Sequence, residues 1–184
     1  MNKKTRPRAS IRSCTTDRLP AKARLRRIRL FAMDVDGVLT DAGMYYSESG
    51  DEWKKFNTRD GMGIKLLQKA GLITAIVTQE RTRLVARRAE KLAIPEVHQE
   101  VMDKVSVIRD MASRYGLSLD EVAYIGDDVN DLEALTAVGF SAAPADAMPR
   151  VLQAVDYVCR KKGGEGAVRE VVELILEALQ ADKS

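Results

Sequence analysis

Short apolar runs alternate with stretches of helical periodicity from residue 28 onward. The runs of strand length lie at residues 28–33, 72–77, 121–125, 139–142 and 156–159. Apolar positions recur at helical spacing in residues 61–69, 81–92, 104–115, 131–138, 147–155 and 167–179. Strands that alternate with helices predict an α/β fold, a Rossmann-like doubly wound parallel sheet with helices on both faces.

One segment departs from this alternation. Residues 43–47 and 52–57 are rich in β-forming side chains and flank the turn sequence Glu48-Ser-Gly-Asp51. This pattern predicts a β-hairpin directly after the first strand.

Carboxylates stand where several of the predicted strands end. Asp34 and Asp36 follow the first apolar run, and Asp127 and Asp128 follow the run at 121–125 after a glycine. The carboxyl ends of parallel strands meet at one edge of a sheet, where such folds bind ligands. Leaving several desolvated anions together is costly, so we expect a cation at this edge.

Thr78, Lys104 and Asp131 join these carboxylates at the same edge. Oxygen ligands from carboxylates suit Mg²⁺, and we predict Asp34, Asp36 and Asp127 as its ligands. Asp128 and Asp131 are expected to lie just outside the ligands and support them.

The same residues suit the transfer of a phosphoryl group. Asp34 is placed to attack phosphorus and form an aspartyl-phosphate, and Asp36 to protonate the leaving group and then activate water. Gly37 permits a sharp bend and a close approach of the backbone to phosphate. Thr78 and Lys104 would donate to the phosphoryl oxygens.

This ordered set resembles the haloacid dehalogenase superfamily. DVDGVLT (residues 34–40) resembles its first motif, Thr78 the second, Lys104 the third and GDDVND (residues 126–131) the fourth. The second aspartate, Asp36, resembles that of the phosphatases and phosphotransferases rather than that of the dehalogenases. About 40 residues separate Asp34 from Thr78, and neither they nor the interval to Lys104 can hold a cap domain.

The sequence around the motifs resembles that of the capless sugar-acid phosphatases, which act on 3-deoxy-D-manno-octulosonate (KDO) 8-phosphate or on KDN 9-phosphate. The segments that carry this resemblance are GDEWKKFNTRDGMGI, EKL at 90–92, AYIGDDVND and GGEGAVRE. It implies a Mg²⁺-dependent phosphatase that forms a homotetramer with a central barrel of hairpins. It also implies that the C-terminal glycine-rich segment reaches a neighbouring subunit's active site, with Arg169 near substrate.

The motifs give conflicting indications of the length of the sugar acid. Glu80, with Lys91 expected to hold it, resembles the nine-carbon type, as does WKKFNT with its Asn57, whereas Arg59-Asp60-Gly61 resembles the eight-carbon type. The interpretation leans slightly to the nine-carbon acids. Lys55, Arg59 and Arg169 are candidates for the substrate carboxylate. Gln79 stands where these enzymes usually have glycine.

The charge distribution and the cysteine content indicate the nature of the N-terminal segment and the cellular compartment. Residues 1–29 hold eleven Lys and Arg and one Asp, net +10, so the remainder carries −7 of the total of +3. We expect residues 1–27 to be a disordered basic leader and 28–180 the phosphatase domain, without a nucleic-acid partner. A tail for nucleic acid or an anionic surface and a transit-like sequence are the alternatives for the leader, and the lack of aromatic residues among its charges weakens the first. Two cysteines without metal spacing favour a reducing cytoplasm, and no apolar run spans a membrane.

Two other interpretations remain open. Similar domains are fused to acylneuraminate cytidylyltransferases, where they serve as non-catalytic oligomerisation domains. Receiver domains also combine an acceptor aspartate, acidic neighbours, Thr and Lys, but there the acidic pair precedes the acceptor strand.

Overall fold

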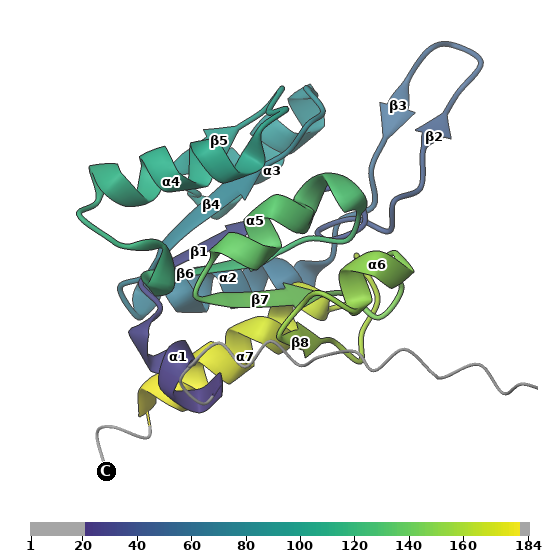
Figure 1. Cartoon of the computed structure of the whole chain (residues 1–184). Helices are drawn as coiled ribbons and strands as arrows, with labels where there is room; N and C mark the ends of the chain where they lie inside the picture. The colour runs from purple at the N-terminus through teal and green to yellow at the C-terminus, as the bar shows by residue number, and fades with distance from the viewer. Residues whose placement is uncertain (1–20, 181–184) are drawn as a thin grey trace, which may run out of the picture.

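A six-stranded parallel sheet forms the centre of the protein (Figure 1). The computed structural model describes residues 21–180. The strand order is β5-β4-β1-β6-β7-β8, and every neighbouring pair is parallel. Its strands are β1 (Leu30–Met33), β4 (Ile73–Val77), β5 (Glu96–His98), β6 (Val122–Ile125), β7 (Phe140–Ala143) and β8 (Tyr157–Val158). The predicted α/β architecture is therefore confirmed.

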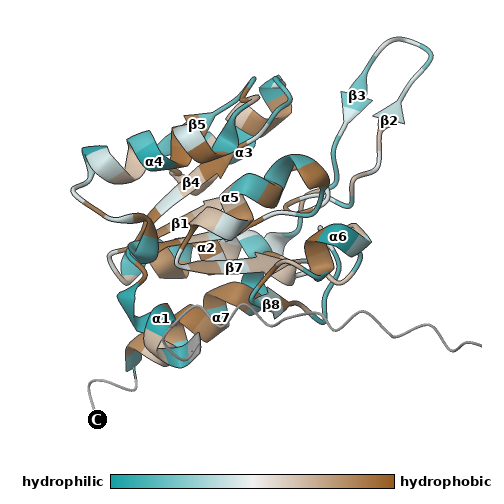
Figure 2. Cartoon of the chain, in the orientation of Figure 1, coloured by the Kyte–Doolittle hydropathy of each residue, from teal (hydrophilic) through white to brown (hydrophobic). Residues whose placement is uncertain are grey.

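Helices cover both faces of this sheet. Side chains of α1 (Ala21–Arg27), α2 (Thr58–Lys69), α3 (Arg83–Leu92) and α7 (Ala167–Gln180) join one apolar cluster. Side chains of α4 (Lys104–Arg114), α5 (Leu132–Ala137) and α6 (Pro149–Leu152) join the other. In Figure 2 the apolar colour gathers on the strands and on the helix faces turned toward them. None of the helices in the described part of the chain is long and apolar enough to cross a membrane.

The central strands β1, β4 and β6 are buried on both sides, which explains their nearly continuous apolar sequences. In β1, Phe31 and Met33 belong to one cluster, while Leu30 and Ala32 belong to the other. Successive strand side chains point to opposite faces, so a run without alternation fits a strand between two helical layers.

The predicted hairpin is present but short. It consists of β2 (Tyr45–Tyr46) and β3 (Glu52–Trp53), which are antiparallel and project from the body (Figure 1). An isolated bridge between Thr40 and Phe56 closes its base. Apart from the hairpin, only α2 lies between β1 and β4, so the predicted lack of a cap domain at this point is confirmed.

The predicted leader boundary at residue 27 is wrong, because residues 21–27 form α1. Leu25 is buried in the core, and Arg24 donates to Asp156 Oδ2 at 2.7 Å and to the Gly139 carbonyl at 3.0 Å. These contacts come from residues distant in sequence, so the basic composition concealed them. Residues 1–20 of the predicted leader lie outside the described residues.

The edge strand β5 was not expected either. Its sequence, Glu-Val-His, is short and polar. In the structure, His98 lies half-buried in the strand with its ring 2.8 Å from Glu96 Oε2. Arg114 and Tyr115 from α4 and its end also donate to Glu96, at 2.8 to 3.0 Å, and fix this edge.

Candidate active site

The predicted catalytic residues gather at the carboxyl ends of β1, β4 and β6. The strand order reverses beside β1, which is where ligands bind in sheets of this type. A cleft of about 410 Å³ opens there. Its lining includes Asp34, Asp36, Thr78, Glu80, Asp127 and Asp128.

Lys104 lies beneath this cleft as its buried cation. It begins α4, after Asp103 caps the helix, and is 3% exposed. Its Nζ lies 2.9 Å from Asp34 Oδ2 and 2.6 Å from Asp131 Oδ1. These two ion pairs raise the pKa of Lys104 although burial opposes the charge. Lys104 therefore stays positive and orients the Asp34 carboxylate.

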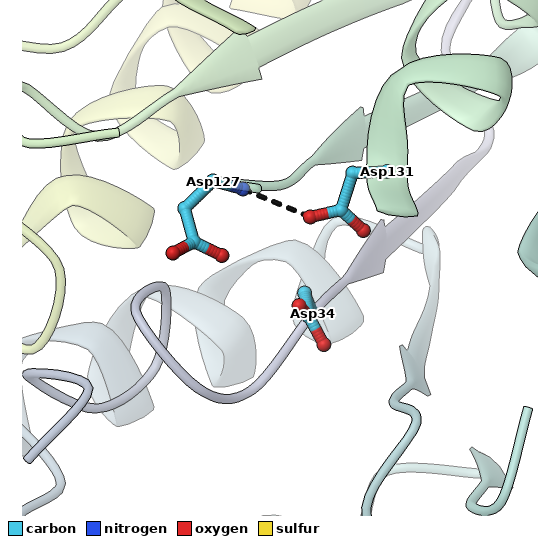
Figure 3. A group of neighbouring side chains, drawn as sticks. All are labelled: Asp34, Asp127 and Asp131. Carbon is cyan, nitrogen blue, oxygen red and sulfur yellow. Dashed lines mark hydrogen bonds between the residues drawn. The ribbon is translucent and has the colours of Figure 1, made fainter. Parts of the chain in front are cut away.

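Asp131 acts as the scaffold of the site. Its Oδ1 accepts from Lys104 and, at 2.6 Å, from the Tyr124 hydroxyl. Its Oδ2 accepts from the backbone N–H groups of Asp127 at 3.0 Å and Asp128 at 3.2 Å (Figure 3). Since a carboxylate offers about four lone-pair positions, Asp131 is saturated. Its predicted role beside a bound metal stays a prediction.

Asp34 and Asp127 remain as the carboxylates with oxygens for a cation. One ligand atom from each of Asp34, Asp127 and Asp131 lies within 4.8 Å of the others. Figure 3 shows the Asp34 and Asp127 side chains facing a common space from two chain segments. Burial first, and then the neighbouring carboxylates, raise the pKa of Asp34 to about 7 and that of Asp127 to about 8. Uncompensated negative charge and oxygen donors fit a hard divalent cation.

Gly37 brings the first loop against Asp127. Its φ is +77°, and a Cβ at this position would lie 2.0 Å from Asp127 Oδ2. A side chain is therefore excluded both by conformation and by space. The predicted need for glycine in this bend agrees with this geometry.

The Asp36 carboxylate lies in the cleft but is not part of the carboxylate group. Its Oδ1 accepts from Lys54 Nζ at 2.6 Å and from Thr40 Oγ1 at 3.3 Å. The structure therefore gathers Asp131, not the Asp36 side chain, with Asp34 and Asp127. The physical reason is the lysine, which draws the Asp36 side chain toward the hairpin.

Lys54 was missed by the sequence reasoning, which chose Lys55. In an extended segment successive side chains alternate, so exposed Trp53 and Lys55 place Lys54 on the opposite, inner side. Lys55 Nζ instead lies 3.4 Å from Asp41, outside the cleft lining. This alternation is visible in the sequence, but which side faces the cleft is not.

Gln79 and Asn130 form a second contact that was not predicted. Asn130 Nδ2 donates to Gln79 Oε1 at 3.1 Å and links the loops after β4 and β6. Both side chains line the cleft. The glutamine in place of the family's usual glycine thus forms part of the rim.

Lys91 does not contact Glu80 of the same chain, so the expected pair of these two residues is wrong for a single subunit. Glu80 precedes α3 and lies 3.3 Å from Lys54, whereas Lys91 is near the far end of α3, beside Gly61 and Arg88. A helical rise of about 1.5 Å per residue separates the two ends by about 12 Å.

The other predicted substrate residues lie outside the catalytic cleft. Asn57 caps α2 and donates to the Gly164 carbonyl at 3.1 Å. Arg59 and Arg169 line a separate pocket of about 490 Å³, where Arg169 pairs with Glu173. Their roles toward substrate stay predictions.

The glycine-rich segment packs against the chain's own catalytic loop. A Cβ on Gly163 would lie 1.9 Å from the Gly37 carbonyl oxygen, and Gly164 N–H donates to the Val38 carbonyl at 3.0 Å. The segment thereby supports the bend that carries Asp36.

Comparisons with known proteins agree with this arrangement. Residues 89–171 match the family described as haloacid dehalogenase-like hydrolase. The 3-deoxy-D-manno-octulosonate 8-phosphate phosphatase KdsC of Yersinia pestis is 43% identical over 155 residues, 84% of this chain and 83% of the relative. The chain belongs to this phosphatase family. The resemblance drawn from the motifs is therefore confirmed.

Solved structures of the same family have the same fold. The octulosonate phosphatase from Moraxella catarrhalis, in complex with magnesium, phosphate and KDO, has a TM-score of 0.84 and 39% identity, over 88% of this chain and 95% of that one. The cobalt-bound enzyme from Haemophilus influenzae has a TM-score of 0.82 and 38% identity, over 85% and 92%.

Proposed function

We propose that this member of the phosphatase family hydrolyses the terminal phosphate ester of a 3-deoxy-2-ulosonic acid through an aspartyl-phosphate on Asp34. The observation that carries the proposal is the buried Lys104, which holds the Asp34 carboxylate at the end of β1 in a cleft shared with Asp36. A non-catalytic assembly domain would have no need of this costly buried arrangement.

In the first step a carboxylate oxygen of Asp34 attacks phosphorus. The P–Oδ bond forms and the bond to the sugar oxygen breaks, while the proton on Asp36 passes to that oxygen and yields the free alcohol. Thr78 borders the cleft and Lys104 lies beneath it, so both support charge on the phosphoryl oxygens.

In the second step water attacks the phosphorus of the aspartyl-phosphate. Asp36, now a carboxylate, accepts a proton from that water. The P–Oδ bond to Asp34 breaks and inorganic phosphate leaves. Asp36 is again protonated and Asp34 is again a carboxylate, so the cycle closes without any further reactant.

Asp34 and Asp127 would hold Mg²⁺, with Asp131 and Asp128 supporting them. Magnesium would neutralise the carboxylates and bind the phosphate anion. These residues fit the ion because Asp34 and Asp127 offer carboxylate oxygens, and because burial and neighbouring charge raise the pKa values of both carboxyl groups.

KDO 8-phosphate is the first substrate to test, because the relatives reported above act on it. A nine-carbon acid such as KDN 9-phosphate is the second candidate. The observation that favours it is that Glu80 lines the cleft, where its carboxylate would accept hydrogen bonds from sugar hydroxyls.

The proposal includes a cytoplasmic homotetramer built around the hairpins. Tyr46 and Trp53 are 67% and 53% exposed on β2 and β3, which supports a contact between hairpins of neighbouring copies. Arg59 and Arg169 are candidates for the substrate carboxylate in such an assembly.

Phosphate release from both sugar-acid phosphates, with and without Mg²⁺, tests the function. Asp34→Asn keeps the shape of the nucleophile and should lower kcat by about 10³-fold or more. Asp110→Asn, the same change at an exposed position on α4, is the matched control. Turnover that survives Asp34→Asn would refute the aspartyl-phosphate, and an inactive parent protein would favour the assembly domain.

A further inference from the structure

Lys54 is a buried cation for which the two steps above have no role. Its side chain is 1% exposed, and its Nζ lies 2.6 Å from Asp36 Oδ1 and 3.3 Å from Glu80 Oε2. Burial opposes its charge, yet the contacts with Asp36 and Glu80 raise the pKa of Lys54. A lysine placed so deep between two carboxylates must stay charged.

The two oxygens of Asp36 have different surroundings. Oδ1 is occupied by Lys54 and by the Thr40 hydroxyl. Oδ2 is buried and has no hydrogen-bond partner within the described residues. A buried carboxylate oxygen without a partner is unusual and points to a function.

From this geometry we infer that Lys54 is a positioning residue: its contact with Oδ1 fixes the Asp36 carboxyl group in the orientation from which Asp36 exchanges protons with the leaving group and with water. The inference rests on the proposed function, because it assigns Lys54 a role in that reaction. Lys54 acts through Asp36 and need not touch the substrate.

Three chain segments meet at Lys54. It follows β3, so it belongs to the base of the hairpin, while Asp36 belongs to the loop after β1 and Glu80 to the loop after β4. The bridge between Thr40 and Phe56 fixes the hairpin base beside the first loop. The lysine therefore depends on a correctly placed hairpin.

The identity of the leaving group separates this role from a structural one. An alkyl phosphate releases a strongly basic alkoxide and needs the proton of Asp36, whereas p-nitrophenyl phosphate releases a weakly basic phenolate and does not. The ratio kcat/KM covers the steps up to departure of the leaving group, so it reports this need. A misplaced Asp36 should slow the alkyl ester selectively.

The first experiment compares Lys54→Met with the parent protein on the sugar-acid phosphate and on p-nitrophenyl phosphate. We expect kcat/KM to fall by about 30- to 100-fold for the alkyl ester and by less than about 3-fold for the aryl ester. The larger loss stays at or below the roughly 100-fold lower end of general acid catalysis, because Asp36 is misplaced and not removed. Lys69→Met, at an exposed position near the end of α2, is the control and should change neither. Lys54→Arg keeps a cation and should retain more activity on the alkyl ester than Lys54→Met.

A double variant tests whether Lys54 acts through Asp36. In an Asp36→Asn background, Lys54→Met should cause less than about a 3-fold further loss on the alkyl ester, because effects of residues that act as a unit are not additive. Melting curves check folding, and Lys54→Gln replaces Lys54→Met if the latter does not fold.

Equal losses on the two esters, or a full further loss in the Asp36→Asn background, would overturn the inference while the proposed phosphatase stands. A parent protein that turns over neither ester would overturn both, so the two failures are distinguishable.

Discussion

Asp127→Asn should stabilise the metal-free protein at alkaline pH, although it removes a residue placed to hold metal. Burial and the charges of Asp34 and Asp131 raise the pKa of Asp127 from 3.8 to about 8. The folded state therefore binds more protons than the unfolded state between these values. Stability contributed by this group falls as pH rises through that window, and the full penalty is present above about pH 8.

The size of the penalty follows from the two pKa values. The folded and unfolded pKa values of Asp127 differ by about four units. Each pKa unit corresponds to about 1.4 kcal/mol, so the upper limit of the penalty is about 6 kcal/mol. Asp127 is half-buried and shares its protons with Asp34, so about half of this, roughly 3 kcal/mol, is a reasonable expectation. For a protein of this length that free energy corresponds to about 6–12 °C in Tm.

Thermal melting in chelator between about pH 5 and pH 8.5 measures this difference. The Tm of Asp127→Asn minus that of the parent protein should be smallest at the acidic end, where pH 5 lies only about one unit above the unfolded pKa of 3.8, and should grow as pH rises. Titrating groups that do not interact with Asp127 cancel in the subtraction. Mg²⁺ should raise the Tm of the parent most at alkaline pH, and the variant much less. Parallel melting curves, or a variant that melts lower than the parent at alkaline pH without metal, would refute the argument.

Three further substitutions test other parts of the structure. Lys104→Met should destabilise the metal-free protein by about 3–5 kcal/mol at neutral pH, measured by urea unfolding, because it leaves Asp34 beside other buried carboxylates without a cation. Gly37→Ala should weaken Mg²⁺ binding by about 10-fold or more in calorimetry, since its Cβ would displace Asp127. Glu96→Gln should cost about 1–2 kcal/mol without changing phosphate release. Because a hydrogen bond from Arg114 first of all lowers the pKa of Glu96 from 4.5 to about 2, the stability from Glu96 is present above pH 4.5 and is lost as pH falls toward 2.

Much of the fold follows from patterns that involve neighbouring residues. Strand β1 is apolar throughout, because both of its faces are covered, and Asp34 and Asp36 follow it. Lys104 was predicted at the right element end, and the structure shows the residue before it, Asp103, as the cap of α4. Both features are local, which is why one sequence was enough to place them.

The missed elements depend on contacts between distant residues. Helix α1 has few apolar side chains and is fixed through Leu25 in the core and Arg24 at Asp156. The strand β5 is three residues long and exists because β4 lies beside it. No periodicity within such short segments distinguishes them from loops.

The same reasoning explains why Lys54 was missed while Asp34 was found. Asp34 breaks a local rule, because a carboxylate directly after a buried strand has an evident cost, and such violations mark functional sites. Lys54 breaks no rule in a polar segment of the sequence. Its cost appears only in the folded chain, where its side chain is 1% exposed between Asp36 and Glu80. Residues that support catalysis through another side chain will therefore escape a sequence analysis more often than those that carry the chemistry, and a buried ion pair to a catalytic carboxylate is the structural sign by which to find them.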